Sequence, residues 1–246
     1  MANKKRNNAA CVLSPEQAAR TVGPGLSFEA AEAYKLLRTN LEFSFPESGN
    51  SKVIGITSSL RGEAKSTTSV NLAYSLAETG KRVVLVEGDL RLPVLSKRMN
   101  LRKAPGLSNL LAGQSSGNEV LQNSGLLNNL KVITAGTIPP NPAELLNSNP
   151  MKVTVDTMRD YFDYVIVDLP PIMAVSDALV VSKYLDGIVL VVRQNVCDKK
   201  SLSETIRQLR FSQAKLLGFV ISGSDSKQRK YRKKYYGSME YQSRGK

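Results

Sequence analysis

The sequence contains no histidine and no tryptophan, and only two of its 246 residues are cysteines. The lack of histidine excludes catalysis by imidazole and metal sites with imidazole ligands. Cys11 and Cys197 have no metal-binding spacing, so we expect a reduced protein of the cytosol. The longest apolar run, Ile188 to Val192, is far shorter than the roughly 20 residues of a membrane-spanning helix. A role at a membrane would therefore depend on a partner or on a charged surface.

Positive charge is in excess, with 34 lysines and arginines against 21 acidic residues and a net charge of +13. This excess suggests an acidic partner, such as a nucleotide, a nucleic acid or an anionic membrane. The charge is uneven, because residues 225–246 hold eight basic residues against two acidic ones and so carry +6. The chain is long enough, and at 41% hydrophobic residues apolar enough, for one α/β domain with a sizeable core.

The stretch from Ser58 to Thr67 has the layout of a phosphate-binding loop. An apolar run, Val53 to Ile56, precedes it, and a run with helical character, Ser69 to Ala77, follows it. In such a loop, backbone N–H groups and the helix dipole hold the phosphates, a lysine neutralises the β/γ charge, and a hydroxyl reaches Mg²⁺. The predicted ATP-binding residues are Gly62, Glu63, Ala64, Lys65, Ser66 and Thr67.

Two positions of this loop depart from the strict glycine spacing. Glycines are expected at positions 59 and 64, where the chain has Ser59 and Ala64. If position 64 needs a backbone conformation that glycine favours, the alanine costs roughly 1–3 kcal/mol. An ordinary strand–turn–helix with a chance Lys-Ser pair is the alternative interpretation of this stretch alone.

The next predicted strand, Arg82 to Val86, ends in a charged loop that carries Glu87, Asp89 and Arg91. Its unbroken apolar character indicates a strand buried on both faces, and ligands of open α/β sheets bind at the carboxyl ends of such strands. Two carboxylates and an arginine next to a phosphate loop are suited to holding Mg²⁺ and accepting a proton. A charged loop without a chemical role is the alternative.

A third buried strand, Tyr164 to Val167, delivers Asp168 to the same edge. A carboxylate at the end of a buried strand, in a chain with a phosphate loop, is the strongest candidate for a magnesium ligand. The alternative is a turn aspartate before Pro170. The other strands and helices are predicted, in chain order, at 93–127 (short helical pieces), 130–134 (strand), 143–146 and 151–161 (helices), 186–192 (strand), 198–211 (helix) and 216–221 (strand).

The two ends of the chain flank this domain. We expect an arm at 1–26 and then a helix from Ser27 to Phe43, ended by Pro46. One face of this helix carries three charged residues: Glu32, Lys35 and Arg38. That face is either an ordinary solvated surface or an ion-pair surface between subunits. Residues 225–246 are too polar and basic to bury a core, so we expect a flexible tail. The tyrosines in it are candidate phosphate acceptors, and anion binding by a basic tail is the alternative.

Taken together, these motifs resemble those of the bacterial tyrosine kinases of capsular and exopolysaccharide synthesis. The resemblance extends from Ser27 to Tyr241. The stretch Ser58–Thr67 looks like the Walker A motif of that family, Val84–Arg91 like its Walker A′ motif, and Val165–Pro171 like its Walker B motif. The charged helix face is similar to its Glu-x-x-Arg-x-x-Arg oligomerisation motif, and the tail to its tyrosine cluster.

The resemblance implies an α/β fold of the P-loop NTPase type, with a mostly parallel sheet covered by helices on both faces. It implies a kinase domain at 27–224, with the oligomerisation helix at 27–45. The catalytic residues would be Lys65, Glu87, Asp89, Arg91 and Asp168. Mg²⁺ would be held by Ser66, Asp89 and Asp168, and the acceptors would be Tyr231, Tyr235, Tyr236 and Tyr241.

The resemblance also implies partners. Subunits of the family phosphorylate the tail of a neighbour within a ring, so we expect a homo-oligomer. A separate transmembrane polysaccharide co-polymerase would activate the kinase, and a phosphotyrosine phosphatase would reverse the reaction. The protein would then work in the cytoplasm, at the inner face of the membrane through that partner, and without nucleic acid.

Three departures from the family pattern bear on activity. Ala64 replaces a glycine and would reduce nucleotide affinity or turnover, Glu87 replaces an aspartate, and Lys35 replaces an arginine and loses its two-pronged hydrogen bonding. A P-loop scaffold without kinase activity is therefore one alternative. A positioning or partition ATPase of the same fold group is another, although the second lysine typical of those proteins would fall at Leu60. A nucleic-acid binder accounts for the charge but not for the motifs.

Overall fold

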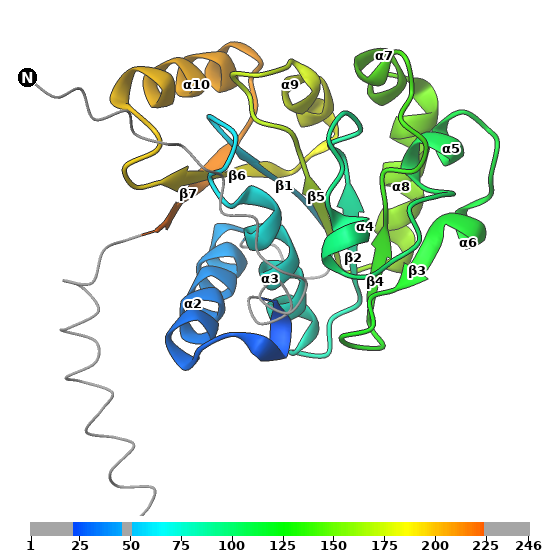
Figure 1. Ribbon diagram of the computed structural model, residues 1–246, viewed down its shortest axis with the longest axis horizontal. Coiled ribbons are helices and arrows are strands. Elements are labelled where there is room, and N and C mark those ends of the chain that lie inside the picture. Colours follow the sequence, from blue (N-terminus) through cyan, green and yellow to red (C-terminus); the bar gives the residue numbers. More distant parts are fainter. Residues whose placement is uncertain (1–21, 46–50, 224–246) are drawn as a thin grey trace, which may run out of the picture.

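The computed structural model describes residues 22–45 and 51–223. These residues form a seven-stranded sheet in the order β3-β4-β2-β5-β1-β6-β7 (Figure 1). All neighbouring strands are parallel except β3 and β4, which pair antiparallel. The strands are β1 (Lys52–Ser58), β2 (Val83–Glu87), β3 (Leu121–Asn123), β4 (Leu130–Ile133), β5 (Tyr164–Asp168), β6 (Gly187–Arg193) and β7 (Leu216–Ser222). The predicted mostly parallel α/β fold is confirmed.

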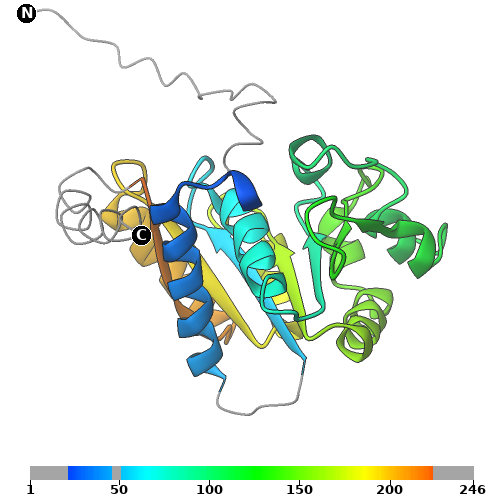
Figure 2. The same ribbon diagram turned by 90° about the horizontal axis from the view of Figure 1, so that it is seen from below.

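Helices cover both faces of this sheet. Figure 2 shows α2 and α3 side by side along one face, while α8, α9 and α10 contribute buried side chains to the hydrophobic cluster of the other. The helices are η1 (Gly23–Gly25), α2 (Phe28–Ser44), α3 (Lys65–Ala77), α4 (Leu95–Arg98), α5 (Leu107–Leu111), α6 (Gly117–Val120), α7 (Pro142–Leu146), α8 (Asn149–Tyr161), α9 (Asp177–Val181), η2 (Ser182–Tyr184) and α10 (Lys199–Phe211).

Successive residues of the central strands alternate between the two hydrophobic clusters. In β2, Val83 and Leu85 belong to the cluster under α2 and α3, whereas Val84 and Val86 belong to the cluster under α8. All four are fully buried, as predicted for a strand covered on both faces. The edge strand β7 differs, because Phe219 and Ile221 are exposed.

Helix α2 begins at a conventional cap. The Ser27 hydroxyl oxygen accepts a hydrogen bond from the Ala30 N–H at 3.3 Å, and the helix ends at Ser44. Its bounds agree with the prediction to within one residue. Within 22–45 and 51–223, no helix is both long and apolar enough to cross a membrane. Most of the predicted arm, Pro46, and the four candidate acceptor tyrosines lie outside the described residues.

The strand register brings the predicted site together. Asp168 pairs with Ile56 of β1 on one side and with Glu87 of β2 on the other. Because these three strands are parallel and adjacent, their carboxyl ends meet at one edge of the sheet. The phosphate loop follows β1 at that edge, so the loop and the predicted carboxylates are neighbours.

Candidate functional site

The loop between β1 and α3 turns through two residues with positive φ. Gly62 has a φ of 82°, and Ala64, the N-cap of α3, lies in the left-handed region with φ 72° and ψ 23°. In the described structure no side chain caps this helix start. The N–H groups of the first helical turn, together with the helix dipole, therefore form a cradle for an anion.

Glu63 braces this loop from inside. Its side chain is fully buried, and its carboxylate accepts hydrogen bonds from the Leu60 N–H at 2.6 Å and the Arg193 N–H at 3.1 Å. The Glu63 carbonyl also accepts from the Ser222 hydroxyl at 2.9 Å. The carboxylate thus fastens the loop to the end of β6 and the carbonyl fastens it to the end of β7, so the Glu63 side chain is engaged within the fold.

Lys65 pairs with two carboxylates of the site. Its ammonium lies 3.1 Å from Asp89 Oδ2 and 3.7 Å from Asp168 Oδ2. Asp168 is fully buried and Asp89 is 5% exposed, so these ion pairs are shielded from solvent. Three of the predicted residues, from the start of α3, the loop after β2 and the end of β5, therefore converge on one point.

The carboxylate of Asp168 keeps one oxygen for a further ligand. Its Oδ1 lies 3.0 Å from the hydroxyl of Ser69, a residue that the sequence analysis did not single out. Its Oδ2 is buried and accepts no hydrogen bond within the described part of the chain. Ser66 lies one turn before Ser69 at the helix start, so a hydroxyl and a carboxylate oxygen are both present for a Mg²⁺ ion. No group of three or more acidic or cysteine side chains among the described residues could hold a metal alone. The donors present fit Mg²⁺, which usually keeps several waters and binds substrate phosphates as well.

Glu87 has a different environment from its neighbour Asp89. Its buried carboxylate accepts hydrogen bonds from three backbone N–H groups, those of Val94, of Leu95 at 2.6 Å and of Ala135 at 3.0 Å. Burial raises the pKa of Glu87, the three hydrogen bonds oppose that rise, and the nearby charge of Asp168 adds to it. One carboxylate oxygen thus binds the start of α4, and the other binds the segment just after β4. The predicted part of Glu87 in metal binding and proton transfer remains a prediction, and its contacts favour a structural role.

Arg91 is also engaged within the fold. Its guanidinium forms a two-pronged ion pair with Asp177 at 2.8 and 3.1 Å. Asp177 is fully buried at the start of α9, a helix that the sequence analysis did not predict. This pair joins the loop after β2 to the segment after β5, and the catalytic role predicted for Arg91 is untested.

The charged face of α2 does not act as one unit. Glu32 and Lys35 pair with each other at 2.8 Å on an accessible surface. Arg38 instead donates to the Ser75 carbonyl at 2.6 Å and fastens α2 to α3. The predicted oligomerisation residues therefore divide into an accessible pair and an arginine that stabilises the fold.

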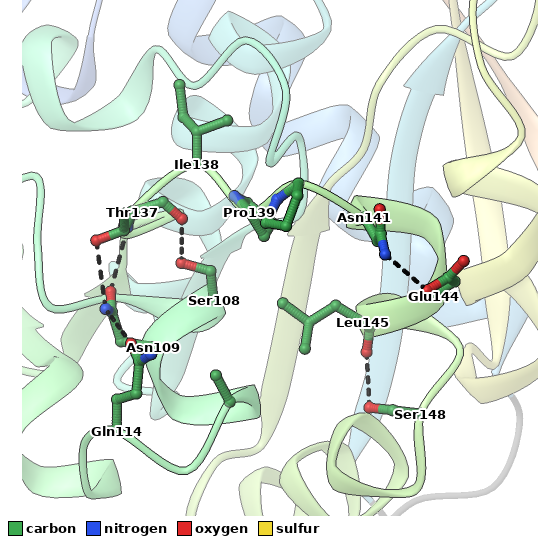
Figure 3. A pocket seen from close by; sticks show the side chains of 12 residues that line it. Ser108, Asn109, Gln114, Thr137, Ile138, Pro139, Asn141, Glu144, Leu145 and Ser148 are labelled. Carbon is green, nitrogen blue, oxygen red and sulfur yellow. Dashed lines mark hydrogen bonds between the residues drawn. The ribbon is translucent and has the colours of Figure 1, made fainter.

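A pocket of about 470 Å³ lies between α5, α7 and the segment 137–141, separate from the phosphate loop. In Figure 3, Leu145 of α7 points into the space that faces α5. Its polar lining is largely paired internally, since the Ser108 hydroxyl donates to the Thr137 carbonyl and Asn141 donates to Glu144 at 3.0 Å. None of the predicted site residues lines this pocket.

Comparison with known proteins gives consistent results. Residues 51–217 match the AAA domain family. Tyrosine-protein kinase YwqD of Bacillus subtilis (strain 168) is 39% identical over 211 residues, which cover 85% of this chain and 87% of that protein. Tyrosine-protein kinase CpsD of Streptococcus pneumoniae serotype 4 is 35% identical over 204 residues, which cover 82% of this chain and 88% of that one.

Solved structures with the same architecture include the kinase domain of Escherichia coli tyrosine kinase ETK. It has a TM-score of 0.75 and 34% identity, covering 80% of this chain and 78% of that one. The chimerical protein CapA2B2 has a TM-score of 0.73 and 34% identity, covering 77% and 83%. The septum site-determining protein MinD of Pyrococcus horikoshii, at 20% identity and a TM-score of 0.59 over 70% of each chain, shares the fold alone.

Proposed function

Because this chain belongs to the family of bacterial tyrosine-protein kinases, we propose that it is an autokinase that transfers the γ-phosphoryl group of ATP to tyrosines of another copy of itself. We propose further that this cycle regulates the synthesis and export of a capsular or extracellular polysaccharide. The observation that carries the proposal is Lys65 between Asp89 and Asp168, at the start of a helix whose N–H groups are open to phosphate.

The chain's own groups divide the work of binding. The N–H groups from Gly62 to Thr67 and the dipole of α3 hold the phosphates, and the Lys65 ammonium neutralises the β/γ charge. The hydroxyl of Ser66 and Oδ2 of Asp168, which accepts no hydrogen bond from the described residues, would hold Mg²⁺. When bound, this ion supplies positive charge to the phosphate oxygens that become more negative during transfer.

We propose that Asp89 handles the proton of the incoming tyrosine. Its Oδ1 accepts from the Leu92 N–H at 3.1 Å, and its Oδ2 faces Lys65, so the orientation of the carboxylate is fixed. The tyrosine oxygen bonds to the γ-phosphorus while the bond from that phosphorus to the bridging oxygen breaks and ADP leaves. Asp89 accepts the phenolic proton.

The acceptors that we propose are Tyr231, Tyr235, Tyr236 and Tyr241. They belong to the basic tail at 225–246, which follows the kinase domain at 27–224. Phosphorylation would cancel much of the +6 charge of this tail and so change which surfaces it binds.

Intact-mass spectrometry with phosphosite mapping tests the proposal. Wild-type protein is incubated with ATP and Mg²⁺, next to Lys65→Met and a matched control, Lys81→Met, whose lysine is exposed in the loop before β2. We expect phosphate on the tail tyrosines of the wild type and of the control, and none on Lys65→Met. A parallel set includes the cytosolic segment of a transmembrane polysaccharide co-polymerase.

The possible failures have separate meanings. Phosphate on Lys65→Met would show that this site does not perform the transfer. Nucleotide binding without any phosphotyrosine, with and without the activator segment, would instead indicate a P-loop scaffold.

We propose that the protein assembles into a ring in which one subunit presents its tail to the next. The accessible Glu32–Lys35 pair is the candidate contact, whereas Arg38 supports α2 from within the subunit. Light scattering of a Glu32→Ala/Lys35→Ala variant with Arg38 intact tests this contact without loosening α2. A mass equal to that of the wild type would refute it.

The remaining partners follow from the same proposal. A transmembrane polysaccharide co-polymerase would recruit and activate the kinase at the cytoplasmic face of the membrane, and a phosphotyrosine phosphatase would reset the tail. Co-sedimentation with vesicles that contain the co-polymerase, compared with vesicles of the same lipids alone, tests the recruitment. Equal sedimentation with both would contradict it.

A further inference from the structure

Arg98 is a cation beside the phosphate cradle that belongs to none of the motifs. It is the last residue of α4, and its Nη1 lies 2.6 Å from the hydroxyl oxygen of Thr67. Thr67 is in the first turn of α3, where the open N–H groups lie. Only the Thr67 side chain therefore separates the guanidinium of Arg98 from the N–H groups proposed to bind phosphate.

The charge of Arg98 is only partly matched by the protein. Within residues 22–45 and 51–223, the guanidinium donates the one hydrogen bond to Thr67 and forms no ion pair. Arginine carries five N–H donors and stays protonated. Burial lowers the pKa of Arg98, and the more distant charge of Asp168 raises it. A partly buried cation with unused donors is poised for an anionic ligand.

The position of Arg98 is built by the buried carboxylate of Glu87. That carboxylate binds the N–H groups of Val94 and Leu95, at the start of the helix that ends with Arg98. Leu95 is itself fully buried in the core. Since α4 is thus held to the end of β2, the guanidinium is presented to α3 from a rigid support, and little freedom is lost when it binds.

We propose that Arg98 is a nucleotide-binding residue, a second cation beside Lys65 that donates to the phosphate chain of the nucleotide held at the start of α3. The Lys65 ammonium is a point charge that pairs with Asp89. The planar guanidinium of Arg98 instead extends from α4 and contacts the hydroxyl of Thr67. A planar fork can contact a phosphate group through two N–H groups at once. The proposal rests on the proposed function, because it requires nucleotide at this site.

Calorimetric titration of the full chain with ADP in the presence of Mg²⁺ tests the proposal. The variants are Arg98→Gln, Arg98→Lys and the control Lys97→Gln, which removes the same charge from the exposed neighbour in α4. We expect the Kd for ADP to rise about tenfold to a hundredfold in Arg98→Gln, less in Arg98→Lys, and not in Lys97→Gln. Competition by adenosine, which has no phosphate, should be the same in all four proteins.

The outcomes separate the possible errors. An unchanged Kd in folded Arg98→Gln would overturn the inference and leave the kinase proposal intact. Equal weakening of ADP and adenosine would also overturn it, because that result means a structural role. A wild type that binds no ADP would overturn both proposals. If Arg98→Gln does not fold, Arg98→Lys decides: it keeps the charge without the fork, so ADP affinity equal to wild type refutes the proposed two-pronged contact.

Discussion

Replacing Ala64 by glycine should stabilise the protein. Ala64 is held in the left-handed region, which costs an L-residue other than glycine about 1–2 kcal/mol. Glycine removes this strain but returns about 0.4–1 kcal/mol of conformational entropy to the unfolded chain. Glycine is also a better N-cap than alanine, by some tenths of a kcal/mol. The sum predicts that the free energy of unfolding rises by about 0.5–1.5 kcal/mol.

Urea unfolding of the nucleotide-free protein measures this change. The matched control is Ala33→Gly, at an exposed position inside α2, where glycine should lower the free energy of unfolding by about 1 kcal/mol. The two substitutions are chemically identical, so opposite signs isolate the backbone conformation. If Ala64→Gly destabilises the protein as the control does, the reasoning about strain at this position is wrong.

Nucleotide affinity is a second readout for the same variant. Because Ala64 already has the left-handed conformation in the nucleotide-free loop, its strain is present before and after binding. We therefore expect the Kd for ADP with Mg²⁺ to change by less than about threefold. A large gain in affinity would instead support the expectation, from the family resemblance, that Ala64 slows the enzyme through its phosphate loop.

The remaining predictions concern buried charges. Glu87→Gln leaves at least one of three backbone N–H groups unpaired and should lower the free energy of unfolding by about 1–3 kcal/mol in urea. The pKa of Glu87 is raised in the folded protein, so its carboxyl group stabilises the fold at pH values below its ordinary pKa of 4.5, and this contribution is lost as the pH rises. The loss of stability caused by Glu87→Gln should therefore be larger near pH 4.5 than in mild alkali. The reverse order would contradict the direction of the pKa shift. Arg91→Ala leaves Asp177 buried without its partner and should cost about 2–4 kcal/mol, whereas Arg91→Met/Asp177→Leu should recover most of that loss; no recovery would mean that the pair is not the cause. ADP should bind more weakly in EDTA than with Mg²⁺, and equal affinities by calorimetry would argue against Asp168 as a metal ligand.

The sequence predicts the strands of the site well, because their signal is local. The apolar runs of β1, β2 and β5 each end in a polar residue at the sheet edge, and parallel strands place those ends together. The convergence of Lys65, Asp89 and Asp168 follows from that topology. By contrast, β3 is three residues long, without an alternating pattern, and α9 is a five-residue helix after a proline-rich turn. Such short elements depend on packing rather than on local preference.

The direction of a side chain is what the sequence leaves open. Glu87 is the last residue of β2 and Asp89 lies two residues further in the loop that follows, and both suggest metal binding. Only the folded loop shows that Glu87 meets three N–H groups while Asp89 faces Lys65. The sequence predicts only short helical pieces for the segment that contains Arg98. The contact between Arg98 and Thr67 could not be predicted, because it depends on how residues 88–94 are folded.

Lys65 has a consequence for which anions the loop can select. In the nucleotide-free protein its charge is already compensated by two shielded carboxylates, so a small anion that pulls the lysine away leaves those carboxylates exposed to each other. Orthophosphate or chloride therefore gains little by entering. A polyphosphate that arrives with a divalent cation would offset this cost, because Asp168 would hold the cation while the anion pairs with the lysine. Under the proposed function, the ion pairs of Lys65 would therefore favour metal-bound nucleotide over simple anions.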